Sequence, residues 1–380
     1  MNLFGDYFKY VKNPTITNSI ASTSPVRVVV LIPAHNEAGS IASTIEAQLA
    51  QSRVADRIVV ISDNSTDQTY EIAARYPVLA TKTVNNKHKK SGALNWAWRN
   101  FAQDADIVVC LDADTVLPSN AIHDWVEEFR KNPVLGGSSS KFTMLGESTI
   151  VRLQRAEFAK WTTTGLRRGW TSVLAGTGCA IRNSVLKQVT ELDDRDGPWS
   201  YDSMVEDFEL TYQIRRMGYL CQISPTVRAY TDAMKSYKTL WAQRMKWQVG
   251  TVEDLVSIGF NRLTAIDWLQ QALGLFAAVL RILWVALLII AATPYGSLSH
   301  SIYWLLIPLI FIVSDTAQAY LIPHRDRKDI LLAAALIPQE FFAWMRAGWF
   351  LSAWYEVLVG KVTRRRKDRW SMQYAAEGVN

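Results

Sequence analysis

The sequence contains little of what a disulfide framework or a zinc site needs. It has three cysteines in 380 residues, Cys110, Cys179 and Cys221, and no CxxC or Cys/His spacing links them. A disulfide-stapled fold and a structural zinc site are therefore disfavoured, and a reducing compartment fits. The chain also lacks a GxGxxG turn after its first apolar run and a P-loop, which disfavours a dinucleotide-dependent hydride enzyme and a P-loop nucleotide hydrolase.

The sequence also has only a small excess of positive over negative charge. Lys and Arg number 41 against 35 Asp and Glu, which gives a net charge of +6. This excess is too small to indicate a nucleic acid partner, although it suits an anionic membrane face or a phosphate-rich ligand. With 49% hydrophobic and 20% charged residues, general disorder is excluded. The length allows two or three domains with a sizeable core.

The first 25 residues lack the continuous apolar core of a signal peptide. Positions 1–12 are aromatic and basic, and positions 13–25 are rich in Ser, Thr and Pro. We expect this N-terminal segment either to lie on a membrane as a short helix or to be a frayed end.

Two long apolar runs occur in the last third of the chain. Residues 268–292 and 301–322 are each long enough to cross a bilayer, and aromatic residues cluster near their ends. We predict two transmembrane helices there, the alternative being a pair of buried core helices. Within them, Arg281 and Asp315 are expected to pair, because ionisable groups inside a membrane usually find partners.

Amphipathic segments flank these two runs. Residues 236–263 are predicted to form an interface helix, and 264–360 the membrane region. After residue 330, charges are scattered among tryptophans, which favours interfacial or re-entrant helices over a single third crossing.

Basic residues follow the second run at 324–328 and return in the tail, 361–380. The positive-inside rule places both on the cytoplasmic side, so an integral membrane protein with its front part in the cytoplasm is expected. The tail has two interpretations: it binds anionic membrane lipids, or it acts as a gating loop that closes over a bound ligand.

The front of the chain alternates β-branched runs with segments of helical spacing. Val26–Ile32, Arg57–Ile61 and Ile107–Leu111 are typical of buried strands. This alternation predicts an α/β domain over residues 26–235, with a mostly parallel, Rossmann-like sheet covered by helices on both faces. In such sheets ligands bind outside the carboxyl ends of the strands.

Acidic residues follow these strands at the predicted ligand-binding edge. Asp63 follows the second strand, where a carboxylate can accept hydrogen bonds from a nucleobase, or can simply form a turn. Asp112 and Asp114 follow the third strand, where alternate residues can present two carboxylates in one turn. Hard oxygen ligands suit Mg²⁺ or Mn²⁺, which can bridge to a diphosphate. We therefore predict a divalent metal site here, the alternative being acids that cap helices or face water.

Other charged residues stand at predicted helix starts. Lys90 precedes a helix whose N-terminus can also face a phosphate, and Glu206 and Asp207 open another helix. Because acids are favourable at any helix start, that pair alone proves little.

A later helix carries a flat aromatic ring, an amide and a cation on one face. Gln243, Lys246 and Trp247 lie at i, i+3 and i+4, which suits a sugar or a diphosphate. The alternative is an amphipathic helix on the membrane surface.

Taken in order, these motifs resemble those of membrane-associated family-2 glycosyltransferases of the cellulose/hyaluronan synthase-like kind. The resemblance covers residues 26–250 and extends more loosely into the membrane region. Each motif is common by itself, whereas their shared order and spacing are specific. The matching segments are Pro33–Glu37, Ser62–Asp67, Lys90–Asn95, Asp112–Asp114, Gly176–Gly178, Glu206–Asp207 and Gln243–Trp247.

The resemblance implies a GT-A fold, a nucleotide-sugar donor (usually UDP-linked), Mn²⁺ or Mg²⁺, and inversion at the anomeric carbon. By matching position, Asp63 would bind the nucleobase, and Asp112 and Asp114 the nucleotide and the metal. Asp207 would be the general base, with Glu206 beside it. The other implied donor contacts are Pro33, His35, Glu37, Lys90, Gln243, Arg244, Lys246 and Trp247, and the implied acceptor contacts are Gly176, Thr177, Gly178 and Trp247.

Two positions depart from the family's pattern. Lys246 replaces the usual arginine of a Q-x-x-R-W motif, which keeps the charge but loses the bidentate fork. Val205 replaces the usual threonine before the Glu-Asp pair, so a hydroxyl is absent while both acids remain.

The implied function is transfer of a sugar from a nucleotide-sugar to a hydroxyl on a saccharide, lipid-linked or protein acceptor, with membrane lipids as partners and no nucleic acid. A polyprenyl-phosphate or protein glycosyltransferase is the alternative to a polysaccharide synthase. A non-catalytic nucleotide-sugar-binding scaffold is disfavoured because the acids are intact. A nucleotidyl- or phosphotransferase would leave Glu206-Asp207 and Gln243–Trp247 without a role. Two crossings are few for a secretion channel, so a self-secreting synthase would need to form homo-oligomers.

Overall fold

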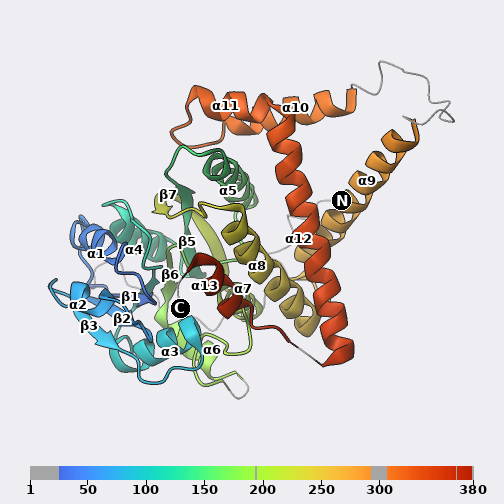
Figure 1. Ribbon diagram of the computed structural model, residues 1–380. Coiled ribbons are helices and arrows are strands. Elements are labelled where there is room, and N and C mark those ends of the chain that lie inside the picture. Colours follow the sequence, from blue (N-terminus) through green and yellow to red (C-terminus); the bar gives the residue numbers. More distant parts are fainter. Residues whose placement is uncertain (1–24, 193–194, 292–305, 365, 379–380) are drawn as a thin grey trace. The chain divides into compact units, whose positions relative to one another are not determined.

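The computed structural model describes residues 25–192, 195–291, 306–364 and 366–378 (Figure 1). The chain forms two compact units, each of which is described by itself. The first comprises Met1–Leu145 and Trp161–Ala233, and the second comprises Gly146–Lys160 and Met234–Asn380. The predicted N-terminal segment, apart from its last residue, and the turn between the two predicted membrane helices lie outside the described residues.

The first unit is built on one seven-stranded sheet with the strand order β3-β2-β1-β4-β6-β5-β7. β1 pairs in parallel with β2 and β4, β2 with β3, and β5 with β7, whereas β6 runs antiparallel to β4 and β5. The strands are β1 (Val28–Ala34), β2 (Arg57–Ser62), β3 (Leu79–Lys82), β4 (Ile107–Cys110), β5 (Leu135–Met144), β6 (Cys179–Arg182) and β7 (Leu220–Thr231).

Helices cover both faces of this sheet, because successive strand residues point to opposite sides. In β1, Val28, Val30 and Ile32 enter one hydrophobic core, and Val29 and Leu31 enter the other. The first core is closed by α1 (Ile41–Leu49), α2 (Thr69–Ala73) and α4 (Ala121–Lys131), and the second by α3 (Lys89–Phe101), α6 (Asn183–Thr190) and α7 (Glu206–Arg216).

The predicted α/β fold with a mostly parallel sheet is therefore confirmed. The buried, β-branched strands β1, β2 and β4 are those that the sequence predicts, and each ends at the same edge of the sheet. Because β6 runs in the opposite direction, the loop that precedes it also reaches this edge. The Asp112 backbone N–H donates to the Gly176 carbonyl there at 2.9 Å.

The second unit is helical. Its helices are the first part of α5 (Thr149–Arg168), then α8 (Tyr237–Ile258), α9 (Ala265–Ala291), α10 (Leu306–Ala319), α11 (Arg327–Ala334), α12 (Leu336–Thr363) and α13 (Arg369–Glu377). Within it, the buried carboxylate of Asp329 accepts hydrogen bonds from Arg152 at 2.8 Å and from Arg155 at 2.5 Å. These bonds fasten the start of α11 to α5.

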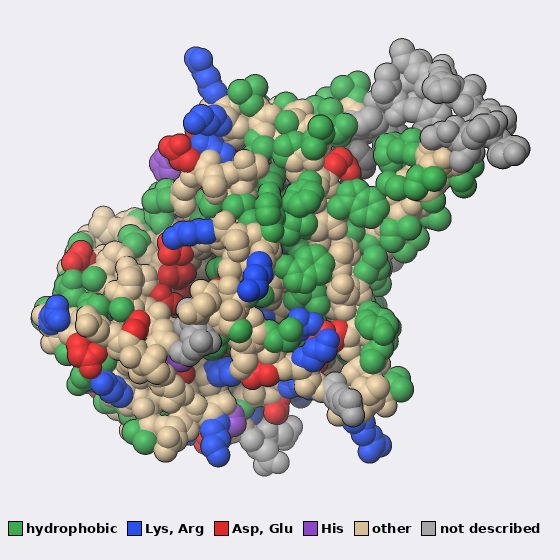
Figure 2. All heavy atoms as spheres, viewed as in Figure 1, with side chains coloured by type: hydrophobic (Ala, Val, Ile, Leu, Met, Phe, Trp, Pro, Cys, Tyr) green, Lys and Arg blue, Asp and Glu red, His purple; other side chains and the backbone are tan. Residues whose placement is uncertain are grey.

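One described helix is long and apolar enough to cross a membrane. This helix is α9, whose apolar stretch Ala265–Ile290 is almost entirely exposed, and Figure 2 shows hydrophobic side chains gathered over it. The described part of the second predicted span is α10, which is shorter. α11 and α12 together are also long and apolar enough, but they are bent by 73° at the break between them, as in a broken span or a re-entrant loop.

Candidate active site at the carboxyl edge of the sheet

Lys90 joins two acidic loops of the first unit. Its ammonium lies 2.5 Å from Asp112 Oδ1 and 3.3 Å from Glu206 Oε1. Burial by itself would lower the pKa of Lys90, but the charges of Asp112 and Glu206 raise it well above its ordinary value. The loop after β4 and the start of α7 therefore meet at one cation, which the first turn of α3 supplies.

The glycines of the predicted acceptor loop allow this close approach. A Cβ on Gly176 would lie 2.4 Å from Lys90 Nζ and 3.1 Å from an Asp112 carboxylate oxygen. Gly178 has φ +135°, a conformation that favours glycine. Between them, the Thr177 hydroxyl oxygen is buried and has no hydrogen-bond partner within the described part of the chain. A ligand hydroxyl at this position would satisfy it.

A second group of carboxylates forms around Asp114. Burial, together with the charges of Asp112 and Asp232, raises the pKa of Asp114 to about 7. Burial and the charges of Asp114, Asp112 and Asp232 also raise the pKa of Glu37 to about 7, although Ser40 donates a hydrogen bond to it. The carboxylates of Glu37, Asp112, Asp114 and Asp232 therefore lie close enough for their negative charges to repel one another. A cation at this place would reduce that repulsion.

Asp63, the predicted nucleobase ligand, is held rigidly at the end of β2. It is 5% exposed, and its Oδ1 accepts hydrogen bonds from Thr83 Oγ1 at 2.6 Å and from Asn86 Nδ2 at 2.8 Å. Burial raises its pKa, while these two hydrogen bonds oppose the rise. His35 Nδ1 lies 2.7 Å from the Asp63 carbonyl oxygen, so the loop after β1 is tied to the same strand end. Pro33, in β1, is paired with Ile61 of β2.

Asp207 stands at the start of α7, next to Glu206. Burial and the charge of Glu206 raise its pKa to about 6, and the nearby charge of Lys90 limits the rise. Its Oδ1 accepts a hydrogen bond from the Phe208 backbone N–H at 2.8 Å. A buried carboxylate whose pKa is near 6 can take up a proton near neutral pH, as a general base must.

The donor set at Asp112 and Asp114 suits a divalent cation. Within the described ranges, no group of three or more His, Cys, Asp and Glu side chains forms a complete metal site. Mg²⁺ commonly binds through one or two carboxylates plus the phosphates of a substrate, so two aspartates are sufficient ligands. Burial and, after it, the charges of Asp112 and Asp232 raise the pKa of Asp114, so a bound cation would favour its charged form.

The other predicted donor residues belong to α8 in the second unit. Arg244 is buried, pairs with Glu157 at 2.9 Å, and donates to Gln243 Oε1 at 2.9 Å. Its guanidinium also lies over the Trp247 ring, 4.4 Å from the centroid. Lys246 lies over the Trp370 ring of α13 at 3.3 Å. The donor and acceptor roles of these residues stay predictions.

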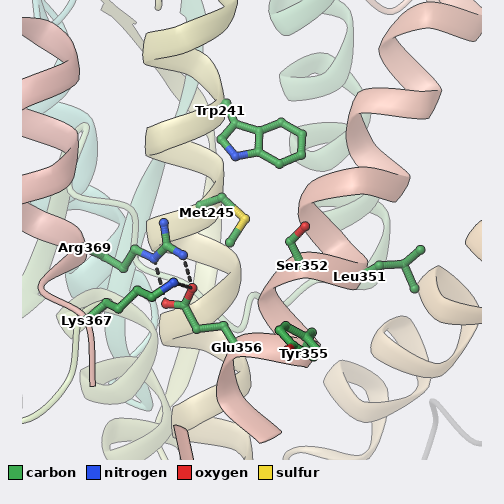
Figure 3. A pocket seen from close by; sticks show the side chains of 8 residues that line it. All are labelled: Trp241, Met245, Leu351, Ser352, Tyr355, Glu356, Lys367 and Arg369. Carbon is green, nitrogen blue, oxygen red and sulfur yellow. Dashed lines mark hydrogen bonds and ion pairs between the residues drawn. The ribbon is translucent and has the colours of Figure 1, made fainter. Parts of the chain in front are cut away.

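A hollow of about 430 Å³ also lies in the second unit (Figure 3). Trp241 and Met245 of α8 line it, together with residues of α12 and Lys367 and Arg369 near the start of α13. Both cations are bound to Glu356 of α12, Lys367 at 3.4 Å and Arg369 Nε at 2.8 Å. The predicted site residues are not among those that line this hollow.

Sequence reasoning missed Asp232, Thr83 and Asn86. Asp232 directly follows β7, so the rule that ligands gather at strand ends would have found it had that strand been recognised. Thr83 follows β3 in the same way, and Asn86 lies in the same loop, between β3 and α3.

Comparisons with known proteins agree with this geometry. Residues 29–190 match the sequence model described as "Glycosyl transferase family 2". The chain is 29% identical over 240 residues to a probable glycosyltransferase, YdaM, of Bacillus subtilis (59% of this chain, 55% of the relative). It is 25% identical over 272 residues to a poly-β-1,6-N-acetyl-D-glucosamine synthase of Staphylococcus aureus (69% and 63%). It thus spans less than two thirds of either relative.

Among solved structures, the chain resembles the mannosyltransferase PcManGT from Pyrobaculum calidifontis, in complex with GDP-Man and Mn²⁺. The TM-score is 0.61 at 20% identity, with 94% of this chain and 95% of that chain covered. This likeness supports the fold. The first unit has the GT-A fold, the fold of that structure. More particularly, the part of this unit that matches the family 2 glycosyl transferase model is residues 29–190.

Proposed function

We propose that the protein transfers a sugar from a nucleotide-sugar to a hydroxyl acceptor at the cytoplasmic face of a membrane, with inversion at the anomeric carbon. The observation that carries this proposal is the meeting of Asp112, Lys90 and Glu206, with Asp207 directly beside them. This arrangement supports the proposal because a cation that can bind a diphosphate lies beside a carboxylate that can act as the general base.

The chain's own residues divide the chemistry between them. Asp63 holds the nucleobase through its carboxylate, and Lys90 offsets the negative charge of the diphosphate. Asp207 accepts the proton of the acceptor hydroxyl as its oxygen bonds to the anomeric carbon. The bond from that carbon to the diphosphate oxygen breaks, and the nucleoside diphosphate leaves with the electron pair. One base and no covalent intermediate give inversion, through an oxocarbenium-like transition state.

A divalent cation, Mn²⁺ or Mg²⁺, would be held by Asp112 and Asp114 and would stabilise the charge that develops on the leaving diphosphate. Around it, Glu37 and Asp232 add negative potential, and Thr231 donates hydrogen bonds to the Asp114 carboxylate at 3.2 and 3.3 Å. These bonds fix the carboxylate orientation, as the outer partners of metal ligands usually do.

The tail keeps its two proposed roles. Within the second unit, Glu356 binds Lys367 and Arg369, and Arg366 pairs with Glu253 of α8 at 2.7 Å. Trp370 covers Lys246. A tail fastened to the helix that carries Gln243–Trp247 supports the gating role more than binding of lipid alone, because several of its cations already have acidic partners.

A donor-hydrolysis screen tests the proposal. Purified protein is incubated with a panel of UDP- and GDP-sugars, including UDP-N-acetylglucosamine and GDP-mannose, with Mn²⁺ or Mg²⁺, and released nucleoside diphosphate is measured. We expect turnover of at least one sugar, abolished by chelation of the metal. Transfer to saccharide, polyprenyl-phosphate and peptide acceptors then separates the polysaccharide synthase from its alternatives. Absence of turnover with every sugar, in protein that is folded and membrane-reconstituted, would contradict the proposal.

A further inference from the structure

The segment that leads into the Glu206–Asp207 turn is fastened to α3. Residues 195–203 contact this helix at two places and its N-cap residue, His88, at a third. The guanidinium of Arg99 donates to Asp196 Oδ1 at 2.5 Å, and the ring of Tyr201 stacks on His88 with centroids 3.9 Å apart. Between these contacts, the backbone of Trp199 is bound by the side chain of Asn95.

The contact between Asn95 and Trp199 uses both ends of the amide. Asn95 Nδ2 donates to the Trp199 carbonyl at 2.7 Å, and the Trp199 N–H donates to Asn95 Oδ1 at 3.0 Å. The asparagine thereby pairs with the Trp199 main chain much as a neighbouring strand would. Gly197, with φ +148°, lies so close that a Cβ there would come within 2.4 Å of Asn95 Oδ1.

Of the three contacts, this one holds the segment most firmly. Arg99 and Asp196 are 41% and 61% exposed, and exposed ion pairs contribute little. Asn95 is 0% exposed and Trp199 is 4% exposed. If the amide were removed, the N–H and C=O of Trp199 would be left unpaired in a dry environment, which is far more unfavourable than losing a surface pair.

α3 also contacts the Glu206–Asp207 turn directly. Lys90, in the first turn of α3, contacts Glu206. Arg195 binds Glu209 of α7 through both terminal nitrogens, at 2.7 and 2.9 Å, and donates to the Pro198 carbonyl. Each of the three parts, the lead-in segment, α7 and α3, thus contacts the other two. Asn95, which is fully buried, makes the contact between α3 and the lead-in segment.

We propose that Asn95 is a positioning residue for Asp207: by fixing the backbone at Trp199, it sets where the start of α7 presents the Asp207 carboxylate to the acceptor hydroxyl. This inference rests on the proposed function. Asn95 lies on α3 beyond Lys90, and its side chain bonds the Trp199 backbone and the Tyr201 hydroxyl, both in the lead-in segment. Its removal should therefore affect the chemical step and not the binding of the donor.

Asn183 provides a matched control. It is also a buried asparagine, 1% exposed, and it also holds α3. Its Oδ1 accepts from Trp98 Nε1 at 2.8 Å, and its Nδ2 donates to the Ala102 and Ala105 carbonyls at 2.8 Å, toward the far end of the helix. Asn95→Ala and Asn183→Ala each remove a buried amide that holds α3, the first on α3 itself and the second on α6, but only the first loosens the segment that leads to Asp207.

The test compares Tm, donor Kd and kcat of the two variants, with the sugar that the wild type hydrolyses in the screen above. We expect similar falls in Tm, donor Kd within about twofold of wild type for both, and a kcat lowered about ten- to a hundredfold only in Asn95→Ala, since small misplacements of reacting groups have effects of this size. Gly197→Ala, which displaces Asn95 from the other side, should give the same pattern.

A kcat that stays at the wild-type value in Asn95→Ala, or that falls equally in Asn183→Ala, would overturn the positioning role while leaving the proposed function intact. A donor Kd that rises in step with the fall in kcat would also overturn it, since Asn95 would then act on the donor site. A wild type that turns over no nucleotide-sugar would instead refute the proposed function, and this inference with it.

Discussion

The ammonium of Lys90 lies 3.3 Å from the carboxylate of Glu206 and 2.5 Å from that of Asp112, so one cation joins the starts of two helices and the end of a strand. Its side chain is 19% exposed, and that of Glu206 is 8% exposed. A largely buried cation between two acids is well placed to exchange one acidic partner for the phosphates of a donor.

Replacement of Lys90 by methionine should therefore impair both binding and turnover. We expect donor KM to rise and kcat/KM to fall by about a hundredfold, the size of effect seen when one charge-stabilising donor is removed. Steady-state kinetics with the hydrolysed sugar measure this change. Lys87→Ala, in the exposed loop before α3, is the control and should leave both constants unchanged. Equal effects at the two lysines would mean that the loop acts only through its overall charge.

Gly176→Ala tests how closely the acceptor loop must approach. Its new methyl would meet Lys90 Nζ at 2.4 Å, and since that atom is the end of a flexible side chain, the fold should persist while the ammonium moves away. We expect an activity loss of about tenfold or more, with little change in Tm. Gly39→Ala, with nothing within 4 Å of its Cβ, is the matched control. Wild-type kinetics in Gly176→Ala would show that Lys90 has no fixed position in catalysis.

The raised pKa of Asp207 predicts a pH dependence. A general base works when deprotonated, so kcat/KM should be level above about pH 7, reach half of that level near pH 6 and approach a tenfold fall per unit below about pH 5. A base with the ordinary aspartate pKa of 3.8 would keep nearly full activity down to about pH 5. A pH profile at saturating, constant Mn²⁺ measures the midpoint. A profile that is flat from pH 5 to 8 would argue against Asp207 as the base.

Membrane insertion through α9 can be tested directly. We expect the protein to stay in the membrane fraction at alkaline pH, and Thr363→Cys, at the end of α12, to be labelled from the cytoplasmic side only. The native cysteines Cys110, Cys179 and Cys221 are all buried, so background labelling should be low. Extraction of the protein by alkaline carbonate would contradict an integral span. Labelling from the opposite side would reverse the predicted topology.

Part of the fold was accessible from sequence for a simple physical reason. β1, β2 and β4 are continuous β-branched runs, as expected for strands buried on both faces. β5 is rich in Gly and Ser and carries no such signal. Its glycines serve close packing: a Cβ on Gly137 would lie 2.3 Å from Leu174, and one on Gly136 would lie 2.7 Å from Ile214. These residues are distant from each other in the sequence, so no local sequence pattern could predict the contacts between them.

The same distinction applies to the charged residues. Acids that follow recognised strands, such as Asp63 and Asp112, could be predicted because parallel strands end at one edge. Asp232 was missed along with β7. The expected pairing of Arg281 with Asp315 is not what the structure shows: Arg281 contacts Glu340 of α12 at 3.1 Å. Sequence reasoning compared two helices adjacent in the chain and could not anticipate that α12 returns alongside α9.

The most direct test of the whole account separates donor binding from turnover at two aspartates. Binding of the hydrolysed nucleotide-sugar is measured by calorimetry with Mn²⁺, and its turnover by nucleoside diphosphate release. Asp207→Asn should bind the donor as wild type does but lose about a thousandfold or more in kcat, since the base is gone. Asp114→Asn should lose the Mn²⁺-dependent part of binding. Full activity in Asp207→Asn, or unchanged Mn²⁺-dependent binding in Asp114→Asn, would contradict the assignment of this edge of the sheet as the active site.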